Sequence, residues 1–141
     1  MVNDCQCGRM ATMAQSTLDV DFYLSSTDGP TLRFAGPSSA IESLRDACER
    51  LAGGELRVTI SNIDGVGLSA NVGAVEFRLG GEDGFCRRNG DPPSFVFDGN
   101  RLQWEARARL LDPLVEPGAT GFQHLEPNVV EGICVEVEVL R

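Results

Sequence analysis

The chain has 141 residues, with 21 acidic and 12 basic side chains; every basic residue is arginine, and the formal net charge is −9. This length suits one domain, and the hydrophobic content of 42% is typical of a globular protein. The acidic excess argues against binding to a nucleic-acid backbone or an anionic membrane surface, because both are negatively charged. It is compatible with a basic protein partner, whose approach it would accelerate, and with a simple role in solubility.

The N-terminal segment and the cysteines bear on the location of the protein. Residues 1–15 have no hydrophobic period and no signal-peptide pattern, so we expect a flexible leader followed by a single domain over residues 16–141. No apolar stretch approaches the ~20 residues of a membrane helix. The five cysteines are irregularly spaced and accompany one histidine, which favours neither a disulfide framework nor a structural zinc site. Reduced thiols indicate a cytoplasmic location, and we expect no cofactor and no metal.

Apolar and polar residues alternate in several short segments, which is the pattern of half-buried strands. The expected strands are residues 17–24, 31–35, 55–63, 75–79, 94–97, 122–125 and 133–140. Buried parallel strands would show unbroken apolar runs instead. The pattern therefore predicts an α+β fold, a two-layer sandwich of one largely antiparallel sheet with two helices on one face.

The first helical segment follows the expected strand at 31–35. Ser39 and Glu42 form a capping-box pattern, an apolar stripe follows, and glycines at 53–54 are expected to end the helix. Glycine-containing segments at 65–67 and 80–93 are expected to be loops.

The second helical segment, residues 101–112, is predicted to begin at a cap formed by Asn100 and Gln103 and to end at Pro113. Its apolar residues spread over more than one side, with Trp104 on one of them. Such a helix either lies between two layers or presents an apolar face to a partner. Trp104 is therefore a candidate partner-binding residue, and burial within the same chain is the simpler interpretation.

Four carboxylates occupy outward positions of the first and last strands. Asp19 and Asp21 alternate with apolar residues in the first strand, and Glu136 and Glu138 do so in the last. Side chains two residues apart project from one face of a strand, about 7 Å apart. If both strands contribute to one face, four like charges gather there at a cost in stability. Such a face is a candidate for binding a cationic partner, although solvated strand faces are the simpler interpretation.

His124 is the only histidine, so any nucleophilic mechanism with a histidine base must use it. Glu126 lies two residues further along the chain, and Cys134 lies on the next strand, from which it could approach His124. No Gly-x-Ser-x-Gly turn marks a nucleophile. A small hydrolase or isomerase using His124 with Glu126 is an alternative function, and a surface role for His124 is the simpler interpretation.

Before its first helix the chain carries the segment Thr31-Leu32-Arg33-Phe34-Ala35-Gly36, and before its last strand Gly121-Phe122-Gln123-His124-Leu125-Glu126-Pro127. In these segments it resembles the small immunity proteins of bacterial polymorphic toxin systems. Those proteins are compact cytoplasmic domains that bind and block a cognate toxin. The resemblance implies an acidic inhibitor of a basic toxin, and it identifies no binding residue.

The sequence therefore favours a non-enzymatic binding protein for a basic protein partner. We expect the partner to meet the four strand carboxylates and the apolar face around Trp104. A further alternative is a structural subunit that forms a homo-oligomer through the edge of its C-terminal strand.

Overall fold

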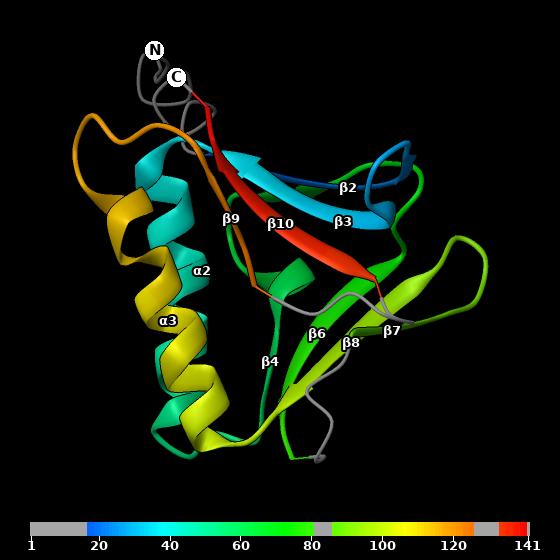
Figure 1. Ribbon diagram of the computed structural model, residues 1–141. Coiled ribbons are helices and arrows are strands. Elements are labelled where there is room, and N and C mark those ends of the chain that lie inside the picture. The colour runs from blue at the N-terminus through cyan, green and yellow to red at the C-terminus, as the bar shows by residue number, and fades with distance from the viewer. Residues whose placement is uncertain (1–16, 81–85, 126–132, 141) are drawn as a thin grey trace, which may run out of the picture.

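The computed structural model describes residues 17–80, 86–125 and 133–140. In these residues the strands form two mixed sheets, and two helices pack side by side along one side of them (Figure 1). The expectation of an α+β fold is confirmed. The leader expected over residues 1–15 lies outside the described residues.

The five-stranded sheet has the order β5-β2-β3-β10-β9. Strands β2 (Leu18–Ser25) and β3 (Gly29–Gly36) form an antiparallel hairpin, and β10 (Cys134–Val139) pairs with β3 in parallel. The edge strands are β5 (Val66–Leu68), parallel to β2, and β9 (Phe122–His124), antiparallel to β10. Strands from the beginning and the end of the described chain therefore lie side by side in the middle of this sheet.

The four-stranded sheet has the order β4-β6-β8-β7. Its central strands, β6 (Ala74–Leu79) and β8 (Ser94–Gly99), are parallel to each other. The edge strands, β4 (Arg57–Thr59) and β7 (Cys86–Asn89), are antiparallel to their neighbours. A short 3₁₀ turn, η1 (Ile60–Asn62), follows β4.

The observed pair of mixed sheets differs from the expected single, largely antiparallel sheet. Among the described strands, β2 with β5, β3 with β10 and β6 with β8 are parallel pairs. Residues in β6 nevertheless alternate between buried and more exposed, as do most of those in β2 and β10, because mainly one face of each sheet packs on the core. Alternation therefore indicated which face is buried but not the direction of the neighbouring strand. The segments expected to be loops also contain the edge strands β5 and β7.

Helix α2 (Ser38–Ala52) contacts both sheets and packs along α3 (Arg101–Val115). Its buried residues form the predicted apolar stripe: Ala40, Ile41, Leu44, Ala47, Cys48 and Leu51. The expected capping box at Ser39 is wrong, because the helix already begins after Pro37. The carbonyl of Pro37 accepts the first helical hydrogen bonds, and Ser39 therefore lies within the first turn.

The predicted cap of α3 is confirmed. Asn100 Oδ1 accepts a hydrogen bond from the Gln103 N–H, and Gln103 Oε1 accepts one from the Asn100 N–H, both at 2.8 Å. The predicted end of the helix at Pro113 is wrong, because α3 continues to Val115. Proline removes one main-chain donor, but Leu114 is buried against the core and keeps the last turn in place.

Aromatic side chains join the two sheets to α3. Phe77 of β6 stacks on Trp104 at 4.8 Å between ring centroids and makes edge contacts with Phe97 at 5.4 Å and Phe34 of β3 at 6.1 Å. Trp104 is 0% exposed, and its indole N–H donates to the carbonyl of Arg78 at 2.8 Å. The structure thus corrects the expectation that Trp104 binds a partner, because its ring fills the core.

Replacement of Trp104 by alanine tests this assignment. Trp104→Ala should lower the free energy of unfolding by roughly 3–5 kcal/mol, because it leaves a large cavity in the core. Leu102→Ala on the same helix is the control, since Leu102 is 76% exposed and its truncation should change stability by less than about 0.5 kcal/mol. Urea unfolding followed by circular dichroism measures both values. Similar values for the two variants would contradict the assignment.

Candidate functional site

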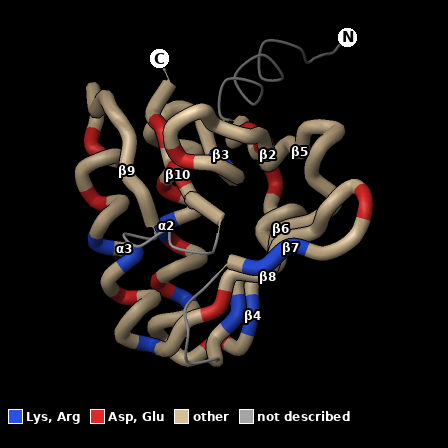
Figure 2. The backbone as a smooth tube through the Cα atoms, turned by 45° about the vertical axis from the view of Figure 1, so that its right-hand side comes forward, with Lys and Arg blue, Asp and Glu red and all other residues tan. Residues whose placement is uncertain are grey.

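The predicted acidic residues lie on the outer face of the five-stranded sheet. Strand β3 lies between β2 and β10, and the registers place Asp21 and Glu136 on either side of Arg33. Asp19 and Glu138 flank the next outward position of β3 in the same way. The registers and the two-residue period of the strands therefore put the four carboxylates on one face, although β2 and β10 are not neighbours. Figure 2 marks the acidic residues along these strands in red. We call this surface, comprising Asp19, Asp21, Glu136 and Glu138, the acidic face.

Arg33 is the cation at the centre of the acidic face. Its guanidinium donates to Glu138, with Nε at 2.9 Å from Oε1, and the same Nε lies 3.8 Å from Glu136 Oε2. Burial disfavours the charged form of Arg33, but the hydrogen bond and charge of Glu138 outweigh this effect and raise its pKa. Because one arginine faces four carboxylates, the surface keeps an acidic excess.

Asp21 is held by three hydrogen bonds on the side of the sheet near β5. Three groups donate to Asp21 Oδ1: Ser69 Oγ at 2.7 Å, the Phe22 N–H at 2.8 Å and Asn71 Nδ2 at 3.5 Å. The bond from Ser69 is the main reason why the pKa of Asp21 is lowered, and the other two bonds add to it against the opposing effect of burial. Asp19 is exposed on the same strand.

The lowered pKa of Asp21 makes its contribution to stability depend on pH. Because the folded-state pKa lies below 3.8, the ionised carboxylate stabilises the fold above this pH, and the stabilisation disappears as the pH falls through the folded-state value. Asp21→Asn keeps an acceptor for Ser69 but does not ionise. At neutral pH the free energy of unfolding of the wild type should be about 1 kcal/mol higher than that of this variant, because hydrogen bonds to a charged group stabilise more than neutral ones.

Urea unfolding of both proteins at a series of pH values measures this difference, which should vanish in strong acid. Asp19→Asn is the control for removal of one charge from the same strand. A difference for Asp21→Asn that grows as the pH falls would contradict the prediction.

A polar cluster of Asp28, His124 and Cys134 lies at one end of the acidic face. One donor atom from each residue (a carboxylate oxygen, a ring nitrogen and the thiol sulfur) lies within 4.8 Å of the others. His124 Nε2 is 3.6 Å from Glu136 Oε1, and within the described part of the chain this buried nitrogen has no hydrogen-bond partner. Glu126, expected to act with His124, lies outside the described residues. The approach of Cys134 to His124 was anticipated from the sequence, whereas Asp28 was not, because it comes from the distant turn between β2 and β3.

The cluster contains no activated nucleophile. Burial, followed by the charges of Asp28 and Glu136, raises the pKa of the Cys134 thiol above its ordinary 9.0. A catalytic cysteine needs the opposite shift, together with access to substrate, and Cys134 is buried. The geometry therefore argues against a hydrolase that uses Cys134 with His124.

Alkylation of the native protein checks the state of Cys134. Its burial and raised pKa should make Cys134 react with iodoacetamide at least roughly tenfold more slowly in the native protein than in urea. Digestion and mass spectrometry would report the modification of each cysteine separately. Cys48, which is also buried with its pKa raised to about 12 by burial, provides the matched slow control. Native labelling of Cys134 at the rate found in urea would contradict the prediction.

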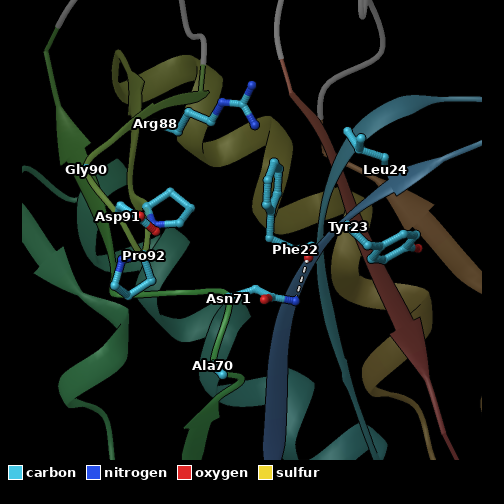
Figure 3. A pocket seen from close by; sticks show the side chains of 10 residues that line it. Phe22, Tyr23, Leu24, Ala70, Asn71, Arg88, Gly90, Asp91 and Pro92 are labelled. Atoms are coloured by element: carbon cyan, nitrogen blue, oxygen red, sulfur yellow. Dashed lines mark hydrogen bonds between the residues drawn. The ribbon is translucent and has the colours of Figure 1, made fainter.

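A separate pocket of about 490 Å³ opens where β2 meets the β7–β8 hairpin (Figure 3). Phe22 forms one wall, and the guanidinium carbon of Arg88 lies 5.1 Å from the centre of its ring. Asn71 Nδ2 donates to the carbonyl of Phe22 at 3.3 Å, and Asp91 and Pro92 line the other side. Arg88 and Asp91 line this pocket with opposite charges, so its lining favours neither a cationic nor an anionic ligand. Its walls are distant in sequence, and no motif indicated it.

Arginines are found on the outer face of the other sheet. Arg57 lies opposite Arg78 across β4 and β6, and Arg87 lies on β7 (Figure 2). Arg78 pairs with Glu76 at 2.5 Å, and Arg87 pairs with Asp98. The outer faces of the two sheets therefore differ in charge, with the carboxylates around Arg33 on one and several arginines on the other.

Strand β10 has no free edge, because β3 pairs with one side and β9 with the other. Hydrogen bonds from the Leu125 N–H to Val135 and from the Val139 N–H to Gly121 extend the contact beyond β9. The structure thus corrects the expectation that copies of the chain associate through this edge. The edges of the sheet are the short strands β5 and β9.

Comparison of the chain with protein-family models, with curated proteins and with solved structures found no match. Among the helices of the described residues, none combines the length and the hydropathy needed to span a membrane. The argument for function therefore depends on the geometry of the site.

Proposed function

We propose that the protein is a non-enzymatic binding protein that holds a basic protein partner on its acidic face. The observation that carries the proposal is the gathering of Asp19, Asp21, Glu136 and Glu138 on one face around Arg33. In its most concrete form, the partner is a basic toxin that the protein inhibits, as the resemblance to immunity proteins implies. No cofactor and no nucleic acid takes part in this function.

Electrostatics explains why such a face suits a cationic partner. Four carboxylates on one face repel one another, and Arg33 between them compensates only part of this repulsion. An approaching cationic surface supplies the missing charge, accelerates the encounter and disfavours acidic competitors. Arginines of the partner would add charge-assisted hydrogen bonds to these carboxylates.

Exposed aromatic side chains on the same face add an apolar contact. Phe122 of β9 lies opposite Glu138 and is 57% exposed, and Tyr23 of β2 lies opposite Thr31 and is 37% exposed. Aromatic residues are enriched among those that dominate binding energy at protein interfaces. The face therefore combines charges that steer a partner with rings that hold it.

A cytoplasmic location belongs to the same proposal. Among the described residues, Cys48 and Cys134 are buried free thiols. Free thiols are usual in the reducing cytoplasm, whereas secreted proteins of this size often carry disulfides.

Three bait proteins test the proposal in cells of the source organism. The face variant carries Asn or Gln at the four residues of the acidic face. The control variant carries the same changes at four exposed acids elsewhere, which are Asp46, Glu49, Asp64 and Glu116. Both variants lose the same formal charge, so only the position of the charge distinguishes them.

A basic protein should be captured by the wild type and by the control variant, and the face variant should retain at least roughly tenfold less. Four pairs worth about 0.2–1 kcal/mol each contribute about 0.8–4 kcal/mol together, and a tenfold loss, which is about 1.4 kcal/mol, lies within this range. Quantitative mass spectrometry measures the retained protein. Equal capture by all three baits, or a captured protein without basic character, would contradict the proposal.

A further inference from the structure

The polar cluster brings three chemically different donors to one point. Asp28 lies in the turn between β2 and β3, His124 ends β9, and Cys134 begins β10. Their oxygen, nitrogen and sulfur atoms lie within 4.8 Å of one another. Tetrahedral zinc holds such donors at about 2.0–2.3 Å from the metal, which places them about 3.4 Å apart. A small adjustment of side chains would therefore close the cluster around one ion.

The surroundings of His124 are consistent with a metal ligand. His124 Nε2 is buried but finds no hydrogen-bond partner within the described residues. Buried polar atoms are otherwise nearly always satisfied. The Asp28 main-chain N–H donates to Ser25 Oγ at 3.1 Å, which holds the turn with its exposed carboxylate beside the cluster. Glu136 Oε1 lies 3.6 Å from the same Nε2 and adds negative charge that attracts a cation to the cluster.

We propose that Asp28, His124 and Cys134 bind a Zn²⁺ ion at the end of the acidic face. Thiolate, imidazole and carboxylate are the ligands that zinc takes in proteins, whereas Ca²⁺ and Mg²⁺ take oxygen ligands. Cys134 loses its proton as it binds the ion, and the proton passes to solvent. Three protein ligands leave a fourth position for water. This inference does not depend on the binding of a protein partner.

Titration of the reduced, metal-free full chain with Co²⁺ tests the site, because cobalt occupies zinc sites and is coloured. A thiolate ligand gives a charge-transfer band in the near ultraviolet, and tetrahedral geometry gives strong bands in the visible. Both should saturate at one ion per chain. Zn²⁺ should abolish them, whereas an excess of Mg²⁺ or Ca²⁺ should leave them unchanged.

Single substitutions assign the ligands. Cys134→Ser should remove the charge-transfer band, and His124→Gln should remove the visible bands of tetrahedral cobalt. Asp28→Asn should weaken Co²⁺ binding by roughly tenfold or more; because Asp28 is exposed, the circular dichroism of this variant should match that of the wild type. The control replaces Cys5 and Cys7, the thiol pair elsewhere in the chain, by serine and should leave the spectrum unchanged.

Three results would overturn the proposal. They are the absence of a thiolate band in the wild type, its persistence in Cys134→Ser, and its loss in the Cys5 and Cys7 control. Unchanged affinity in the folded Asp28→Asn variant would likewise overturn the assignment of this carboxylate as a ligand.

Discussion

The burial of Phe77 between the two sheets and α3 is the constraint on which the rest of the structure depends. Its ring contacts Phe34 of the five-stranded sheet, Phe97 of the four-stranded sheet and Trp104 of α3. Residues at alternate positions of β2, β3 and β10 turn toward this core, so the intervening side chains must point outward. The acidic face is therefore a consequence of how the core packs. Its carboxylates occupy positions that the hydrophobic core cannot use.

Arg33 makes this concentration of negative charge tolerable. At the level of Asp21 and Glu136, strand β3 offers one outward position between them, and Arg33 occupies it. The guanidinium reaches Glu138 as well, so it links β3 directly to β10. One cation among four acids reduces the repulsion enough for the sheet to fold, while the face keeps a negative charge. That balance is what an interface for a basic partner requires, because a fully compensated surface would steer nothing.

Local patterns predicted individual elements well and contacts between elements poorly. The cap formed by Asn100 and Gln103 was predictable, because both residues belong to one helical turn. Trp104 was ambiguous, because apolar residues lie on more than one side of its helix. Only the packing against Phe77 showed that Trp104 is buried while Leu102 remains exposed. The pocket beside Arg88 was not predictable, because its walls come from segments far apart along the chain.

By itself, the sequence determined the α+β composition of the fold and the outward placement of Asp19, Asp21, Glu136 and Glu138, since a two-residue period decides which side chains share a face of one strand. Only the tertiary structure decided that β3 lies between β2 and β10, so that both acidic pairs surround Arg33. It also decided that Asp28, His124 and Cys134 meet at one point. Strand order depends on pairing between distant segments, such as Arg33 and Glu138, which are 105 positions apart. Local periodicity contains no information about which distant strands pair.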